Sequence, residues 1–192
     1  MKKPLQPETK NLTFLLLLSA ISAGIFAGAV YGTGHEVKNA WVHQYFLPEF
    51  SGGTIYEVFR NTFISLFLFI MVEFVTGLSA IGQPAGVLML IYRGFGIGAS
   101  VSAVYMAKGL HAMPEVLILI LPECLAVAGI SILAVREQMR LSRGVFMAVI
   151  AEKSHTDKEF RLYCLEFIVL TGVSLLVAVF ATIMNYVFSS LR

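Results

Sequence analysis

Five apolar runs dominate the sequence, and each is long enough to cross a lipid bilayer as a helix, which takes about 20 mostly apolar residues. They cover residues 12–31, 62–81, 84–106, 114–135 and 165–188. Lipid offers no hydrogen bonds to the backbone, so a spanning segment must satisfy its own N–H and C=O groups, as a helix does. The sequence therefore predicts an all-α, polytopic membrane protein with about five transmembrane helices, forming a single integral membrane domain over residues 1–192.

The composition points the same way. The chain is 57% hydrophobic and 14% charged, whereas a soluble domain is roughly 45–50% apolar and about 25% charged. We expect the lipid bilayer to be its solvent, and a net charge of +2 predicts no broad nucleic-acid surface. Lys2, Lys3 and Lys10 before the first run resemble a signal peptide, but the run exceeds the roughly 7–15 residues of a signal core, which favours a retained helix.

The basic residues predict an orientation, because Lys and Arg favour the cytoplasmic side. Most lie before the first run or between the fourth and fifth: Lys2, Lys3, Lys10, Arg136, Arg140, Arg143, Lys153, Lys158 and Arg161. The segments on the other side carry Lys38, Arg60, Lys108 and Arg192. We expect a cytoplasmic N-terminus and an extracytoplasmic C-terminus, which an odd number of spans requires.

The connection between the first two runs is expected to contact partners. Trp41 and Tyr45, with Phe46 beside them, follow helical spacing and suit the membrane interface. This pattern predicts a short helix on the outer surface. Thr54 and Glu57 form a capping-box pattern, so the second helix should begin before the bilayer.

The connection between the fourth and fifth runs contains an apolar patch, Val145–Ile150, too short to span. We expect it to rest on the inner leaflet beside Arg140 and Arg143. An ordinary surface loop with a buried patch is the alternative. As part of an export complex, the same basic connection could dock an ATPase.

Three ionisable residues fall inside the runs: Glu73, Arg93 and Glu123. Each costs about 2.5–3.5 kcal/mol on insertion scales, so such residues normally face partners or water. Glu73 and Arg93 are equally distant from Gln83, and a turn there would place both roughly 15 Å into the membrane. This register predicts a Glu73–Arg93 pair that fixes helix packing. The alternative is a polar path in a small transporter or channel subunit.

Small residues recur every fourth position in two of the runs, a spacing that lets helices approach closely. The stripes are Gly24, Gly28 and Gly32 in the first run, and Gly94, Gly98 and Ser102 in the third. The pattern predicts helix packing and leaves open whether the partner helix lies within the chain or in another protein.

Signals of catalysis are weak. The histidines fall outside the runs, and none forms a zinc-binding helix pattern with Glu. The serines lack the Gly-x-Ser-x-Gly setting of hydrolases. Gly94–Gly98 lies inside an apolar run with no preceding strand, unlike a phosphate-binding loop. We expect a protein that is not an enzyme, with no metal site and no cofactor.

One stretch, Arg60–Gly98, combines an Asn that enters the second run with the segments Thr76–Pro84 and Leu90–Gly98. In these features it resembles the stage II sporulation protein M family, whose aromatic/basic-Gly-Phe-x-x-Gly stretch is similar to Leu90–Gly98. The layout of five spans and the length near 200 residues also match. The matching positions are Asn61, Gly77, Gly82, Pro84, Arg93, Gly94 and Gly98, and we assign Gly77 and Gly82 to helix packing as well.

The resemblance implies a role in endospore formation. Family members act with stage II sporulation proteins D and P, which degrade peptidoglycan, and anchor that machinery at the septum during engulfment of the forespore. For this chain it implies a scaffold in the septal or engulfing mother-cell membrane. The family extends to organisms that do not sporulate, and the sequence does not determine the oligomeric state.

Overall fold

The computed structural model describes residues 7–34, 55–79, 82–151 and 157–190, and this part of the chain is almost entirely helical. Within it, five helices are long and apolar enough to cross a membrane: Leu12–Thr33, Ile55–Gly77, Gly82–His111, Val116–Met147 and Phe160–Val187. The all-α architecture and the five helices of spanning length are therefore confirmed.

The long helices are α1 (Pro7–Gly34), α3 (Ile55–Gly77), α4 (Gly82–Lys108), α6 (Leu121–Ala151) and α7 (Asp157–Ser190). Between α4 and α6 the chain forms a 3-10 turn (Gly109–Ala112), the short α5 (Met113–Glu115) and a π-helical turn (Val116–Ile120). Pro122 lies in the first turn of α6, where a missing N–H is tolerated. The fourth spanning segment is therefore helical throughout, but its form changes from α to π and back to α between Pro114 and Pro122.

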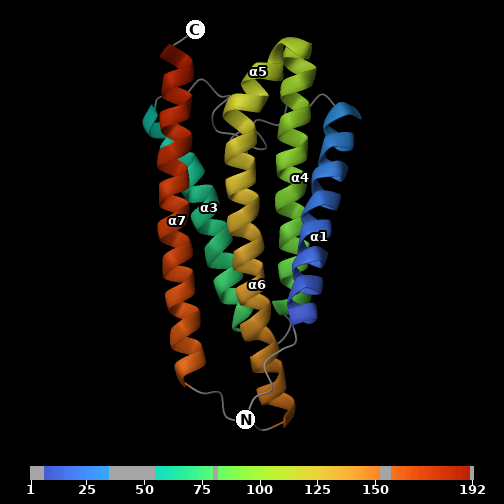
Figure 1. The fold of residues 1–192 in the computed structure, drawn as a ribbon, viewed down its shortest axis with the longest axis vertical. Coiled ribbons are helices and arrows are strands. Elements are labelled where there is room, and N and C mark those ends of the chain that lie inside the picture. Colours follow the sequence, from blue (N-terminus) through green and yellow to red (C-terminus); the bar gives the residue numbers. More distant parts are fainter. Residues whose placement is uncertain (1–6, 35–54, 80–81, 152–156, 191–192) are drawn as a thin grey trace.

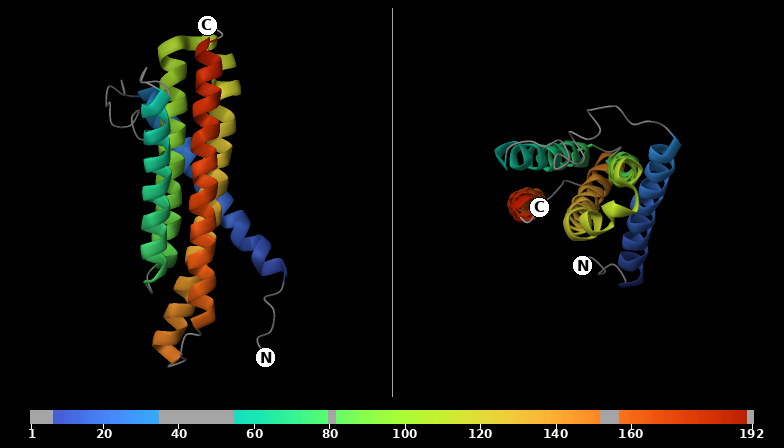
Figure 2. Two further views of the ribbon diagram at one scale, coloured as in Figure 1. Left: turned by 90° about the vertical axis from the view of Figure 1, so that its left-hand side faces the viewer. Right: turned by 90° about the horizontal axis from the view of Figure 1, so that it is seen from above.

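The helices form a bundle with α4 and α6 in the middle (Figures 1 and 2). Helix α1 packs along α4 on one side, and its axis is oblique to the bundle in the side view of Figure 2. Helices α3 and α7 pack against each other and against α6 on the other side. The direct contact between α3 and α4 is small, although they are consecutive in the chain.

The outward faces of the helices are apolar. Large side chains such as Phe26 on α1, Leu88 on α4, Ile168 and Leu176 on α7 are mostly exposed. Contiguous apolar surface on this scale is rare on soluble monomers. A bundle with its core already filled and its outside still apolar fits a lipid solvent, so the structure supports a multi-pass membrane protein.

The turn between α3 and α4 lies earlier than expected. Helix α3 ends at Gly77, not at 81, and α4 begins at Gly82. Leu78 and Ser79 continue with hydrogen bonds of the i to i+3 type back to Val75 and Thr76. Gly82, Gln83 and Pro84 form the first turn of α4, because proline suits the start of a helix as well as a turn.

Helix α6 also departs from expectation. The patch Val145–Ile150 was predicted to lie separately on the inner leaflet, but it continues α6, which runs unbroken to Ala151. A single Gly144 costs a helix only about 1 kcal/mol, so nothing in this segment breaks it. At about 1.5 Å per residue, 31 residues span roughly 46 Å, and the last turns of α6 reach beyond the end of α3 (Figure 2).

Candidate functional site

Arg93 ties three helices together in the middle part of α4. Its Nη1 donates a hydrogen bond to Ser65 Oγ on α3 at 2.8 Å. Its guanidinium carbon stands 5.7 Å from the centroid of the Phe69 ring on the same helix. Glu123 of α6 is its electrostatic partner. Arg93 and Glu123 are both buried, so the hydrogen bond, the ring contact and the attraction between the two charges act inside the bundle, across α3, α4 and α6; we call this arrangement the Arg93 clamp.

The predicted pairing of Arg93 with Glu73 is wrong. Neither carboxylate oxygen of Glu73 has a hydrogen-bond partner among the described residues. Arg93 reaches Ser65 instead, and these two residues are equally distant from Ser79 in the sequence. Because α3 ends at Gly77 and α4 begins at Gly82, the residue level with Arg93 is two helical turns, or roughly 12 Å, from Glu73.

Glu73 lies near the end of α3 instead. It precedes Gly77, the last residue of the helix, by four positions, or roughly 6 Å of helix axis. Its side chain is fully buried, with 0% exposed. Of the three ionisable residues predicted within the spans, Arg93 and Glu123 are brought together and Glu73 is not.

Polar side chains of α6 hold the turn between α3 and α4. Gln138 Nε2 donates to the carbonyl oxygen of Gly82 at 2.7 Å and to Thr76 Oγ1 at 3.0 Å. Ser142 Oγ donates to the carbonyl oxygen of Ser79 at 2.8 Å. These bonds join α6 to the first residue of α4, to the last turn of α3 and to Ser79, which follows that turn.

Tyr163 of α7 completes this arrangement, which we call the turn clamp (Gln138, Ser142 and Tyr163). Its hydroxyl donates to the carbonyl oxygens of Phe74 at 2.9 Å and Glu73 at 3.3 Å. Its ring stacks on Phe74, with centroids 5.3 Å apart. Gly77 leaves space for the hydroxyl, since a Cβ at that position would overlap Tyr163 Oη.

Sequence reasoning missed the turn clamp. Gln138 and Ser142 are four residues apart and therefore share one face of α6. In the sequence they stand among Arg136, Arg140 and Arg143, and this pattern indicates a solvent-exposed, charged connection. The recurrence of small polar residues opposite the charged face was the available signal.

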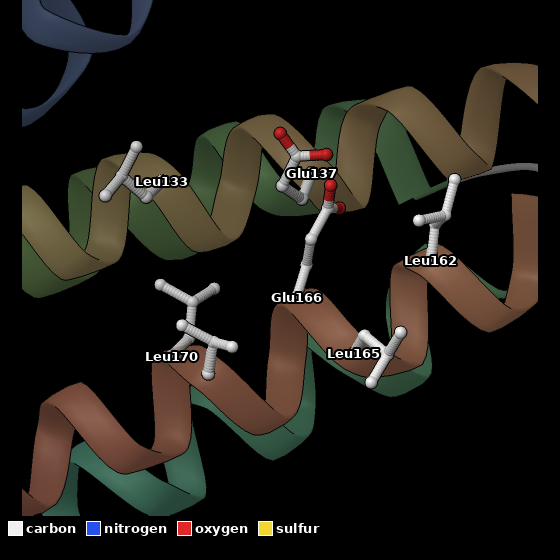
Figure 3. A pocket seen from close by; sticks show the side chains of 7 residues that line it. Leu133, Glu137, Leu162, Leu165, Glu166 and Leu170 are labelled. Carbon is white, nitrogen blue, oxygen red and sulfur yellow. The ribbon is translucent and has the colours of Figure 1, made fainter.

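A groove between α6 and α7 was missed as well (Figure 3). Its volume is about 300 Å³, and it is lined by Leu133, Glu137, Leu162, Leu165, Glu166, Val169 and Leu170. The carboxylates of Glu137 and Glu166 point toward one another across it (Figure 3). Arg140 joins them, with Nη2 3.0 Å from Glu166 Oε2 and Nη1 2.8 Å from Glu137 Oε2. This partly exposed ion network links the two helices beside the turn clamp.

The two glycine stripes face each other, which answers the question that their spacing left open. A Cβ on Gly28 would overlap the Phe95 carbonyl oxygen, and a Cβ on Gly98 would overlap that of Ile25. The other members make the same reciprocal contacts: Gly24 meets Ile91, Gly94 meets Ile21, and Gly32 meets Ser102 and Ala99. The first and third spanning segments thus pack backbone to backbone within the chain.

The remaining predicted positions are placed as follows. Trp41, Tyr45 and Phe46 lie outside the described residues. Asn61 is half-buried near the start of α3, and its Oδ1 accepts a long, 3.5 Å hydrogen bond from Arg60 Nη2. Pro84 is exposed in the first turn of α4.

Within the described ranges, no group of three or more His, Cys, Asp or Glu side chains could hold a metal ion. Comparison with protein-family models, with curated proteins and with solved structures gives no match to this chain.

Proposed function

We propose that this protein is a non-catalytic, multi-pass membrane scaffold that localises peptidoglycan-degrading machinery at the septum during engulfment of the forespore. The functional part of the proposal comes from the resemblance of Arg60–Gly98 to the stage II sporulation protein M family. The physical part comes from what the buried polar residues do. They bind helices of the bundle to one another, as a rigid anchoring body requires.

The Arg93 clamp is the observation that carries this proposal. The Arg93 guanidinium contacts Ser65 and Phe69 of α3 and lies in the field of the Glu123 carboxylate of α6, so its role is in helix packing. Glu73 lies roughly two turns away from that level, so the three ionisable residues do not form one cluster. This arrangement favours a structural body over a transporter that conducts along a shared Glu/Arg path.

The distribution of basic side chains supports a cytoplasmic N-terminus. Arg136, Arg140, Arg143 and Arg161 are exposed at the end of the bundle where α6 leads into α7. Arg60 and Lys108 lie toward the opposite end. By the preference of basic residues for the cytoplasm, residues 35–54 would then face the outside, where peptidoglycan is found.

Binding of the hydrolases is assigned to the outer connection from Gly34 to Arg60, with Trp41, Tyr45 and Phe46 as contacts. The test is affinity purification from sporulating cells, in which stage II sporulation proteins D and P should be recovered with the intact chain. Replacing residues 35–54 by a polar linker of equal length should abolish their recovery while leaving the protein in the membrane.

A control variant with Leu176→Ala on the lipid-facing side of α7 should recover the hydrolases as the unaltered chain does. Equal recovery with the linker variant would move the contact to the spanning helices. If the intact chain from sporulating cells recovered neither hydrolase, the proposal would be refuted.

A further inference from the structure

Two buried side chains near the junction of α3, α6 and α7 carry acceptor oxygens without donors. Both carboxylate oxygens of Glu73 are buried and have no hydrogen-bond partner within the described part of the chain, and the same holds for Gln138 Oε1. Both side chains are 0% exposed. Gln138 Oε1 stands against Gly86, where a Cβ would overlap it. Gly86 and Glu73 lie seven and six positions on either side of Ser79, so these acceptors share one depth.

The donors nearby are already committed. The Tyr163 hydroxyl donates to the backbone carbonyls of Glu73 and Phe74. The Gln138 amide nitrogen has two hydrogens, and it donates to Gly82 and Thr76. The Thr76 hydroxyl donates back to the carbonyl of Val72 at 2.9 Å. None of these groups has a proton left for the Glu73 carboxylate.

The positive charges on the surrounding helices are committed as well. Arg93 of α4 is held at the level of Ser65, two turns away. Arg140 of α6 is paired with Glu137 and Glu166 in the groove. The titratable group that faces Glu73 from α7 is Tyr163. A bare carboxylate that is buried without a counter-charge is strongly unfavourable.

We infer that Glu73 is a proton-binding site: in the folded protein it carries an exchangeable proton as a neutral carboxylic acid, and Gln138 Oε1 is the acceptor of that proton's hydrogen bond. One proton turns one oxygen of Glu73 into a donor, so that a hydrogen bond can join it to Gln138 Oε1. Hard metal cations take about six oxygen ligands, more than the three free acceptors here. The inference does not depend on the proposed scaffold function.

The position of the proton gives it a structural consequence. Glu73 belongs to the segment that the turn clamp holds, because its backbone carbonyl accepts a hydrogen bond from Tyr163, and α3 packs against both α6 and α7. Loss of the proton would leave a charge inside this junction. The bound proton therefore acts as a ligand that keeps α3 joined to its two neighbours.

The test is infrared spectroscopy of the full-length protein in lipid vesicles at neutral pH. The carbonyl stretch of a neutral carboxyl group is separate from the carboxylate bands and shifts when H₂O is exchanged for D₂O. We expect such a band in the unaltered protein and its loss in Glu73→Gln. Glu123→Gln, which alters the carboxyl beside Arg93, should keep it. Glu73→Asp is a second variant in case Glu73→Gln does not fold. In Glu73→Asp the band should persist at a shifted frequency.

Two further arms make the result decisive. Gln138→Leu should keep the band but move it to the frequency of a carboxyl without a hydrogen bond, and an unmoved band would overturn the role of Gln138. Spectra in Na⁺ and in choline should be the same. A band that vanishes in Na⁺ would assign the site to a sodium ion, and a carboxylate signal from Glu73 in both salts would overturn the inference.

Discussion

At the scale of single residues, two buried acids of the same chemical type have different surroundings. Glu123 has Arg93 as its electrostatic partner, whereas Glu73 stands among groups that offer it no proton. Removing one member of a buried ion pair leaves the other uncompensated and costs about 3–5 kcal/mol. The two acids should therefore respond differently when Arg93 is replaced.

Arg93→Leu should destabilise the protein by about 3–5 kcal/mol, because Glu123 would remain charged and buried without its partner. Combining it with Glu123→Leu should restore part of the loss, with a coupling energy of about 0.5–3 kcal/mol. The measurement is a double-mutant cycle from reversible unfolding in detergent micelles.

The matched control combines Arg93→Leu with Glu73→Leu. The two side chains lie roughly two turns apart along the bundle, so their effects should add within about 0.5 kcal/mol. Strong coupling in this second cycle, with additivity in the first, would restore the Glu73–Arg93 pair and contradict the observed register.

Tyr163→Phe tests one bond of the turn clamp. It removes the hydroxyl that donates to Phe74 and leaves the stacked ring in place, so unfolding free energy should fall by about 0.5–1.5 kcal/mol. Tyr186→Phe on the exposed face of α7 should change it by less than about 0.5 kcal/mol. Equal effects of the two substitutions would show that the bond to Phe74 contributes nothing to stability.

At the scale of helices, the contact between α1 and α4 depends on the absence of side chains. Carbonyl oxygens of one helix occupy the space that a Cβ would need on the other. In lipid, where helices gain nothing from hiding apolar surface, such close packing is a main source of association. The helix pair should therefore be unusually sensitive to small substitutions.

Gly98→Leu should push α1 away from α4 and cost about 1–3 kcal/mol or more, measured as a fall in the thermal unfolding temperature in detergent. Gly172→Leu is the control, since a Cβ there meets nothing within 4 Å. By helix propensity alone it should gain about 1 kcal/mol. If both variants lost stability equally, the α1–α4 contact would not be the cause.

The sequence predicted where the helices lie far better than it predicted which of their residues face one another. Apolar length determines that a segment spans, so the five long helices could be predicted. The position of the α3–α4 turn could not, because Gly82-Gln83-Pro84 suits both a turn and the first turn of a helix. An error of about four residues in the centre of the turn moves the residue level with Arg93 by eight positions, or roughly two helical turns, and this misplaced Glu73. The role of Gln138 could not be predicted, because it donates to the carbonyl oxygen of Gly82, which only the folded turn brings within reach.

At the scale of the whole molecule, charge is distributed unevenly between the two ends of the bundle. Exposed arginines gather where α6 leads into α7, while the end with the 3-10 turn carries Lys108 and His111. The exposed apolar faces lie between these ends. Insertion should follow this asymmetry, because cytoplasmic segments retain Lys and Arg.

The orientation can be tested with single cysteines in a background where Cys124 and Cys164 are replaced by alanine. Leu110→Cys, which is exposed at the end with the 3-10 turn, should react with a membrane-impermeant maleimide in intact cells. Arg143→Cys, at the other end of the bundle, should react only after the membrane is permeabilised, because segments rich in arginine favour the cytoplasmic side. The reverse pattern would place residues 35–54 inside the cell, away from peptidoglycan, and would contradict the scaffold role together with the orientation.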